Sequence, residues 1–205
     1  ATSLKAIMDG GVDAFYKGNI ARKIVADQEK YDGIITMEDM AAYVPIERKP
    51  VFGSYKGYKI AAMPPPSSGG VHVVQMLNML ENDDIATKGH NSAATLHLYI
   101  EAMRQAYADR SLYTGDPAFF EVPVKKLTDK NYATETRALI PVDRARKSSD
   151  LAPTIGLNSE SPQTTHFSVM DKWGNAVSNT YTVNYGFYEG MMAAGTGIIL
   201  NNEMD

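Results

Sequence analysis

Two runs of alternating apolar and polar residues, separated by five turn-forming residues, constrain the fold of this chain more than any other feature. The runs are residues 164–170 and 176–184, and Asp171-Lys172-Trp173-Gly174-Asn175 lies between them. Side chains of a β-strand alternate between its two faces. A three-residue loop ending on glycine suits this spacing, because glycine takes the left-handed conformation without strain. We therefore predict a β-hairpin.

The loop determines which residues of the two strands face each other. If it has three residues, counting outward places Thr164 opposite Thr182 and makes Asn184 the diagonal neighbour of Thr164. Opposite residues have Cβ atoms about 5 Å apart, and diagonal ones roughly 7 to 8 Å. A two-residue loop would shift the register by one residue and bring Val183 there instead. The predicted meeting of two hydroxyls therefore depends on the turn.

The first two thirds of the chain is predicted to be mainly helical. Residues 12–30 have apolar residues at helical spacing, which predicts one amphipathic helix. Thr36 with an acid three residues later predicts the start of a second, short helix. A hairpin follows at residues 51–63 with its turn at 55–58, and then an apolar helix from about residue 71. Asn91-Ser92 opens the clearest helix, one face of which is lined by Ala93, Leu96, Ile100, Met103 and Tyr107.

The composition changes between residues 140 and 163. Only scattered apolar residues interrupt Ser, Pro, Arg, Lys, Asn and Asp in this stretch. Such a composition is typical of a solvated linker. We predict a mobile linker over residues 140–163, which ends where the first strand of the hairpin begins.

Composition also excludes several classes of function. The chain has no cysteine, which excludes thiol nucleophiles, disulfides and thiolate metal sites. The net charge of -4 comes from mixed-sign segments, so nucleic acid is not an expected partner. No apolar run approaches the roughly 20 residues of a membrane-spanning helix. The histidines lack metal-ligand spacing, and we expect neither a metal site nor a cofactor.

Thr164 has two interpretations on these grounds. It can be a β-branched strand residue with a solvated hydroxyl. Alternatively, a cut at Gln163-Thr164 would free its α-amino group, whose pKa near 8 makes it a usable base for its own hydroxyl. One event would then create both the base and the nucleophile.

Four separate blocks of sequence bear on this choice. They are "PPPSSGG" before an apolar helix, "EAMRQAYADRSLYTGDP", "QTTHFSVMDKWGNAVSNTYTVN" and "GIILNNEMD". In this order they resemble the γ-glutamyltranspeptidase family of N-terminal-nucleophile hydrolases, and the similarity runs from about residue 10 to the last residue. The resemblance favours the catalytic interpretation of Thr164.

The resemblance implies a precursor that cuts itself into a large and a small subunit, which stay associated in one αββα sandwich of the α+β class. The chain is then a fragment. Residues 1–163 correspond to the later part of the large-subunit region, and residues 164–205 to the start of the small-subunit region. We expect helices to dominate the first two thirds and antiparallel strands to begin at about residue 164.

The resemblance also implies roles for individual residues. Gln163-Thr164 matches the cleavage site, Thr164 the nucleophile and Thr182 its hydroxyl partner. Asn184 and Glu203 match residues that bind the α-amino group of the substrate, and an amide oxygen with a carboxylate suits a cation. The family's oxyanion and carboxylate-binding residues lie outside these 205 residues, so we expect this chain alone to be inactive.

The family moves a γ-glutamyl group from glutathione and related amides onto the threonine oxygen, and then to water, amino acids or peptides. The expected partners are therefore a small-molecule donor, an amino-acid or peptide acceptor and the rest of the precursor. Bacterial members of the family are usually exported, so the resemblance implies a periplasmic or secreted location for this protein. Relatives that process acylated antibiotics or poly-γ-glutamate share the Thr-Thr-His core, so those activities, and an inert structural fragment, remain alternatives. Residues 187–190 depart from the family's Phe-Gly-Ser/Thr-Gly run, which leaves the acceptor open.

Overall fold

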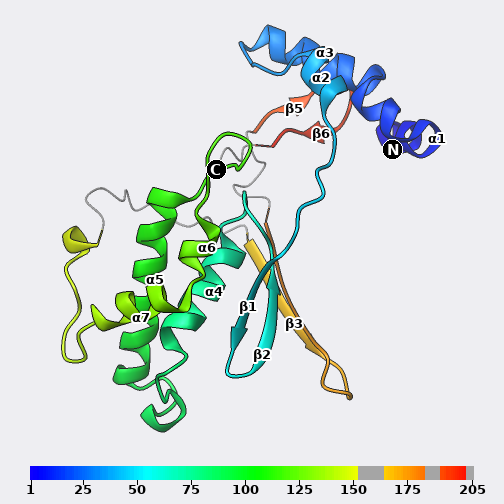
Figure 1. Ribbon diagram of the computed structural model, residues 1–205. Coiled ribbons are helices and arrows are strands. Elements are labelled where there is room, and N and C mark those ends of the chain that lie inside the picture. Colours follow the sequence, from blue (N-terminus) through cyan, green and yellow to red (C-terminus); the bar gives the residue numbers. More distant parts are fainter. Residues whose placement is uncertain (152–163, 183–189, 202–205) are drawn as a thin grey trace. The chain divides into compact units, whose positions relative to one another are not determined.

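The computed structural model describes residues 1–151, 164–182 and 190–201 (Figure 1). They divide into two compact units. Unit 1 is built from Ala1–Ile46 together with Asn158–Asp205, and unit 2 is Glu47–Leu157. Unit 1 therefore joins the two ends of the chain. The predicted division at residue 163 concerns covalent subunits, and the compact units follow a different boundary.

Unit 1 contains three helices and four strands among its described residues. Its helices are α1 (Thr2–Tyr16), α2 (Asn19–Lys30) and α3 (Met37–Ala42), and its strands are β3 (Thr164–Met170), β4 (Ala176–Thr182), β5 (Met192–Ala193) and β6 (Ile198–Ile199). β3 pairs with β4 and β5 with β6, both antiparallel.

The single helix predicted over residues 12–30 is wrong, because the chain breaks between α1 and α2. Gly18 has extended backbone angles (φ -84°, ψ -159°). A Cβ at this position would lie 2.5 Å from the Ala14 carbonyl oxygen, so the close approach requires glycine. The capping box of α3 is confirmed: Thr36 Oγ1 accepts from the Asp39 amide, and the Asp39 carboxylate accepts from the Thr36 amide.

The loop around β5 and β6 packs on the first two helices. Ala193 is fully buried in a cluster with Ile20 and Ile24 of α2. The helix side chains then bond to three consecutive backbone groups of the loop. Asp27 accepts from the Ala194 amide, Lys23 Nζ donates to the Gly195 carbonyl at 3.0 Å, and Ser3 Oγ donates to the Thr196 carbonyl at 2.6 Å. Residues far apart in the sequence thus share one core.

Unit 2 packs a β-hairpin and several helices around α4. Its elements are β1 (Val51–Tyr55), β2 (Tyr58–Ala62), α4 (Gly69–Leu80), α5 (Ala93–Tyr113), α6 (Val124–Leu127) and α7 (Lys130–Ala138), with short 3-10 turns at Ala86–Lys88 and Ser148–Asp150. The predicted hairpin turn is confirmed, since Tyr55 pairs with Tyr58 and both turn residues have positive φ. The predicted helix from about residue 71 begins two residues earlier, at Gly69.

Glycines allow β1, β2 and α4 to approach closely. A Cβ on Gly53 of β1 would lie 2.6 Å from a methyl carbon of Val74, and one on Gly70 of α4 would lie 2.1 Å from the Met63 carbonyl oxygen. The core below this hairpin contains Val51, Val71, Val74 and Leu127.

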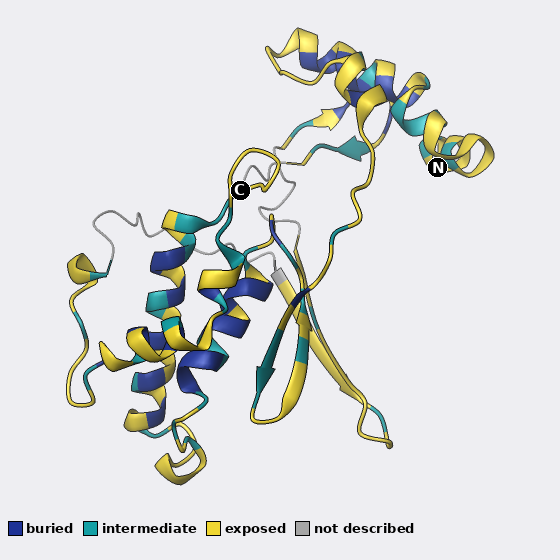
Figure 2. Ribbon diagram, in the orientation of Figure 1, coloured by how far each residue is buried: buried dark blue, intermediate teal, exposed yellow. Residues whose placement is uncertain are grey.

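α5 begins as predicted, with Ser92 Oγ accepting from the Thr95 amide. The apolar stripe predicted along it, however, is exposed: Leu96, Ile100, Met103 and Tyr107 are each more than 40% exposed. Apart from Leu98, the buried side of α5 carries small and polar residues, and Figure 2 shows the buried residues of α4 and α5 in dark blue. These residues are Thr95, Leu98, Glu101, Ala102, Ala106, Ala108 and Asp109.

A buried polar chain connects α4, α5 and α7. Asp109 is 4% exposed and its carboxylate accepts from Gln75 and, at 2.8 Å, from the Tyr132 hydroxyl. Gln75 in turn contacts His72 Nδ1 at 2.8 Å. Burial lowers the pKa of His72 and outweighs the raising effect of Gln75 and Asp109. The structure thus buries the Asp109 carboxylate in the core.

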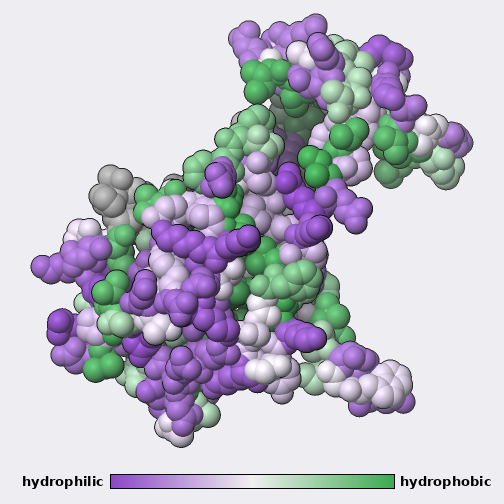
Figure 3. Space-filling model, in the orientation of Figure 1, coloured by the Kyte–Doolittle hydropathy of each residue, from purple (hydrophilic) through white to green (hydrophobic). Residues whose placement is uncertain are grey.

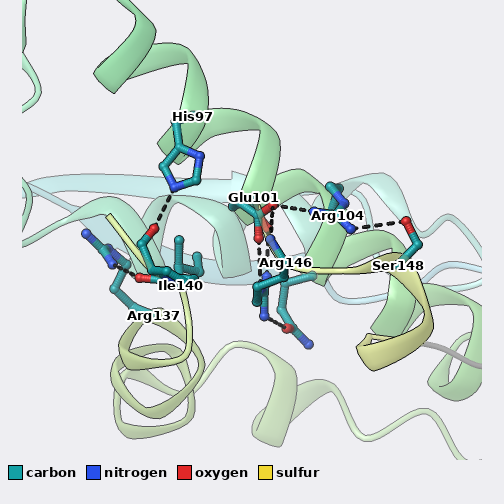
Figure 4. A network of polar contacts seen from close by, with 9 residues as sticks. His97, Glu101, Arg104, Arg137, Ile140, Arg146 and Ser148 are labelled. Carbon is teal, nitrogen blue, oxygen red and sulfur yellow. Dashed lines mark hydrogen bonds and ion pairs between the residues drawn. The ribbon is translucent and has the colours of Figure 1, made fainter. Parts of the chain in front are cut away.

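Within the described residues, no helix is long and apolar enough to cross a membrane. Figure 3 shows hydrophobic and hydrophilic residues side by side over the visible face, consistent with the mixed charge of the chain. The second half of the predicted linker over residues 140–163, residues 152–163, falls outside the described residues. The first part of this linker, up to Ser148, forms hydrogen bonds to α5 (Figure 4), so composition alone did not indicate its contacts.

Candidate active site

The β3–β4 hairpin confirms the register predicted from its turn. Thr164 pairs with Thr182 at the open end of the hairpin, and the ladder continues without a bulge to Met170 opposite Ala176. The alternative register, with Val183 opposite Thr164, is therefore wrong. Thr164 is the first residue of β3 and Thr182 the last residue of β4. The two threonines predicted to carry the chemistry thus lie across the ladder from each other.

Asp171 holds the turn that sets this register. Its amide donates to the Asn175 carbonyl at 2.9 Å, and its carboxylate accepts from the amides of Trp173 and Asn175. Gly174 has a φ of 86°, as a three-residue loop ending on a left-handed residue requires. The side-chain hydrogen bond from Asn175, together with the backbone bonds, lowers the pKa of Asp171 and favours its charged form. The turn is therefore determined by five consecutive residues.

One face of the hairpin is a continuous row of hydroxyl and imidazole groups. His166 lies opposite Thr180, and its Nδ1 is 2.6 Å from Thr180 Oγ1. On the other side of the ring, Nε2 lies 3.0 Å from Ser178 Oγ and 3.2 Å from Ser168 Oγ. This arrangement can orient the imidazole and pass a proton between hydroxyls. It stands on the same face as the Thr164–Thr182 pair, because residues two apart share a face.

Sequence reasoning missed the partners of His166. The signal was available, since the predicted register places Thr180 opposite His166 and Ser178 opposite Ser168. The other face carries the apolar residues of both strands together with Thr165 and Asn179, and on it the Phe167 and Tyr181 rings meet edge to face with centroids 6.5 Å apart. This alternation confirms the predicted assignment of residues to the two faces.

The remaining predicted site residues are not placed by the structure. Gln163, Asn184 and Glu203 lie outside the described residues. The structure therefore brings together Thr164 and Thr182, and the roles of all five residues stay predictions. Within the part of the chain that is described, no three His, Asp or Glu side chains gather as metal ligands would.

The chain is similar to a family of known proteins over its whole length. A family model described as Gamma-glutamyltranspeptidase matches residues 1–205. The "Glutathione hydrolase proenzyme" of Escherichia coli (strain K12) is 50% identical over 205 residues, which are 100% of this chain and 35% of that protein. This chain therefore spans about a third of the length of that relative.

Solved structures agree with this similarity. The gamma-glutamyltranspeptidase of Helicobacter pylori has a TM-score of 0.71 and 47% identity, covering 78% of this chain and 46% of that one. The cephalosporin acylase of Bacillus halodurans has a TM-score of 0.75 and 30% identity, covering 98% of this chain and 35% of that one. The helices and antiparallel strand pairs of this chain therefore have the fold of the matching part of these enzymes. This agrees with the predicted α+β class. The chain belongs to the gamma-glutamyltranspeptidase family.

Proposed function

We propose that the whole protein is a γ-glutamyl transferase and glutathione hydrolase that matures by cutting itself at Gln163-Thr164. The observation that carries this proposal is the pairing of Thr164 with Thr182 at the open end of the hairpin, directly after the proposed cleavage bond. Membership of the family supports the same activity. The matching bacterial relative is described as a proenzyme, which supports maturation by cleavage.

The proposed cleavage consumes one water molecule. The peptide C–N bond between Gln163 and Thr164 breaks, the hydroxyl of water joins the Gln163 carbonyl carbon, and a proton goes to the Thr164 nitrogen. Thr164 then carries a free α-amino group beside its own hydroxyl. Because this amine has a pKa near 8, it accepts a proton at neutral pH, which an amide nitrogen does not.

In the proposed transfer, the Thr164 hydroxyl attacks the γ-carbonyl carbon of the donor amide. The hydroxyl proton passes to the α-amino group and then to the departing amine as the amide C–N bond breaks, which leaves a γ-glutamyl ester on Thr164. Water or the amine of an amino acid or peptide attacks this ester and restores the hydroxyl. Thr182 pairs with Thr164 in the ladder, and we propose that its hydroxyl is the partner of the Thr164 hydroxyl.

Recognition of the donor is proposed to use Asn184 and Glu203. An amide oxygen and a carboxylate accept hydrogen bonds from a protonated α-amino group, and the charged acceptor strengthens the interaction. In the sequence, Asn184 lies two positions after Thr182, the last residue of β4. We further propose that the protein acts in the periplasm or outside the cell, which fractionation of cells expressing the full-length protein would test.

The packing of unit 1 bears on what happens after cleavage. α1 and α2 precede the cleavage bond, whereas residues 193–196 follow it, and both contribute to one core. Cleavage at Gln163-Thr164 would leave these contacts in place. The two products are therefore expected to stay associated without a covalent link.

Substitution of the proposed nucleophile in the full-length protein tests the function. Thr164→Ala removes the hydroxyl, so it should abolish both cleavage, read by intact mass, and turnover of a γ-glutamyl anilide. Thr164→Ser is the matched control, because it keeps the hydroxyl and should retain both. Cleavage and turnover by the Thr164→Ala variant would contradict the proposal.

A second candidate function is that of an acylase for related γ-linked or acylated compounds. The cephalosporin acylase structure favours it, because it matches 98% of this chain. Identity to that enzyme is 30%, against 50% for the glutathione hydrolase proenzyme, so the first function is better supported. A panel of glutathione, acylated cephalosporins and poly-γ-glutamate, given to the mature protein, separates the two by relative kcat/KM.

A further inference from the structure

One face of the β3–β4 hairpin carries three successive polar pairs. They are Thr164 with Thr182, His166 with Thr180 and Ser168 with Ser178. Residues two apart on a strand share a face, so these six residues form one row, which we call the polar row. The Thr164–Thr182 pair lies at the open end of the hairpin. His166 and Thr180 are therefore the neighbours of the candidate catalytic pair on its own face.

The His166 imidazole connects the two strands through both of its ring nitrogens. Nδ1 lies 2.6 Å from Thr180 Oγ1, and Nε2 lies 3.0 Å from Ser178 Oγ. Both hydroxyls belong to β4, so one side chain of β3 contacts two positions of the opposite strand. Nε2 also lies 3.2 Å from Ser168 Oγ on β3. Because each ring nitrogen is engaged, the ring cannot turn without losing a contact.

The open end of the hairpin is where its two strands separate most easily. The turn at the other end sets the register, and Thr164 with Thr182 is the seventh pair counted from it. Ends of ordered segments open more readily than their middles. His166, Thr180 and Thr182 are all exposed in the structure, so burial does not hold this end of the ladder among the described residues. Side-chain contacts across the strands are what resists its opening there.

We propose that His166 and Thr180 are positioning residues for the proposed reaction, because their contact holds β3 and β4 together beside the Thr164–Thr182 pair. The inference rests on the proposed function, in which the Thr164 hydroxyl attacks and Thr182 is its partner. His166 and Thr180 act through the alignment of that pair and not through the substrate. Since the same hydroxyl is proposed to serve self-cleavage and γ-glutamyl transfer, both reactions should depend on the contact.

The expected effect is small compared with loss of the nucleophile. A side-chain pair across two strands shifts the balance between paired and open strands by up to about fivefold. Loss of the His166–Thr180 contact should therefore change rates by about two- to fivefold. Thr164→Ala, in contrast, is expected to abolish cleavage and turnover.

Amide exchange tests the contact itself, in full-length protein that carries Thr164→Ala so that every variant stays uncleaved. Thr180→Val removes the hydroxyl and keeps the β-branched shape of the side chain. It should speed exchange about two- to fivefold at residues 165–167 and 180–182, because these lie at the open end. Acceleration should be weaker at residues 168–170, nearer the turn. Unchanged exchange at the open end would overturn the proposal.

The matched control is Thr165→Val, the same chemical change on the other face of the hairpin. Thr165 lies opposite Tyr181 and outside the polar row. Thr165→Val should leave exchange at the open end within about 1.5-fold of the parent protein, because a small effect is usual for an exposed position. Equal acceleration by Thr165→Val and Thr180→Val would overturn a specific role for the polar row.

Two replacements of His166 separate the Thr180 contact from other effects of losing the imidazole. Asparagine places an amide group where Nδ1 stands, whereas alanine places no polar group there. His166→Ala should therefore exchange about two- to fivefold faster than His166→Asn at residues 165–167. The difference should vanish in the Thr180→Val background, and this cycle cancels the strand preferences of the two replacements. A difference that survives there, or none in the presence of Thr180, would overturn the proposal.

The role in the reaction is tested in full-length protein with Thr164 intact. Thr180→Val and His166→Ala should each lower the rate of self-cleavage, read by intact mass, and the kcat for a γ-glutamyl anilide about two- to fivefold, with KM unchanged. His166→Asn should lie closer to the unchanged protein. Unchanged kcat and cleavage despite faster exchange, or a raised KM with unchanged kcat, would overturn the positioning role.

Failure of the proposed function gives a different result. It would appear as absence of self-cleavage and turnover in the unchanged full-length protein. The exchange comparisons are made in uncleaved Thr164→Ala protein, so they report on the His166–Thr180 contact in either case.

Discussion

Two long hairpins among the described residues have equally regular turns but opposite surroundings. β1–β2 rests on α4, with Val51 6% exposed and Gly53 in close approach to Val74. Along β3–β4, Phe167, Val169 and Val177 are 46%, 59% and 58% exposed. Figure 2 shows the contrast, since β3 and β4 are drawn as exposed along most of their length. Both hairpins nevertheless have complete registers.

The difference shows that pairing and burial have separate causes. Pairing follows from the turn, because the loop type sets which residues face each other. Burial requires other segments of the protein to pack against the hairpin, and a two-stranded hairpin alone is marginally stable in water. The hairpin that carries the candidate catalytic threonines therefore has a locally determined register. Its stability is expected to depend on surfaces supplied by the rest of the protein.

A matched pair of valine substitutions would test this contrast with the largest effect. Val51→Ala removes buried methyl groups from β1 and should lower the free energy of unfolding of the 205-residue chain by about 2 kcal/mol. Val177→Ala removes the same groups from an exposed position on β4 and should change it by less than about 0.5 kcal/mol. Urea unfolding measures both. A similar loss for Val177→Ala would show that the face of β4 is covered in solution.

A second comparison uses the two turn glycines. Gly57 and Gly174 have φ values of 85° and 86°, and a Cβ added to either would meet no atom within 4 Å. Alanine at either position should therefore cost about 1 kcal/mol, from backbone strain alone. We expect Gly174→Ala to speed amide exchange along β3–β4 about fivefold, while Gly57→Ala speeds exchange along β1–β2 less, because α4 supports that hairpin. Equal acceleration in both hairpins would contradict a role for packing.

The smallest effect we expect is a dependence of unit 2 on pH. Burial lowers the pKa of His72, so the unfolded chain binds a proton more readily than the folded one. The contribution of neutral His72 to the free energy of unfolding is fully present above its ordinary pKa of 6.5. This contribution is lost as the pH falls from 6.5 through the lower pKa of His72 in the folded protein. Urea unfolding between pH 7.5 and pH 5 should show the decline. It should vanish in His72→Gln and persist in His166→Gln on the exposed hairpin.

Carboxylates of unit 2 should add a second decline at lower pH. Burial raises the pKa of Glu101, but hydrogen bonds from Arg146 and Arg104 outweigh it and lower the pKa overall. The Arg137 hydrogen bond lowers the pKa of Asp83. Each contributes stability above its ordinary pKa and loses it as pH falls through the folded value. Glu101→Gln should therefore weaken the decline below about pH 4.5, and an unchanged curve would contradict the pairing.

The Thr164–Thr182 pairing of the candidate site was predictable from sequence because its determinants are close together in the chain. The turn from Asp171 to Asn175 sets the Thr164–Thr182 pair, and Thr36 and Ser92 cap helices through bonds to residues three positions away. Each of these features needs only a few neighbouring residues. The partners of His166 followed from the same register, once its consequences along the whole face were counted.

Tertiary structure alone decided which of these local features became buried. The apolar stripe of α5 was correctly assigned to one side of the helix, yet α4 and α7 pack on the side with Leu98 and Ala102. Arg146 lies in a segment with the composition of a linker, but Glu101, 45 positions earlier, gives it a buried partner. Likewise, Ala193 joins α2 across most of the chain. Turns and caps depend on bonds between near neighbours, whereas burial depends on which distant segments meet, and no local pattern contains that information.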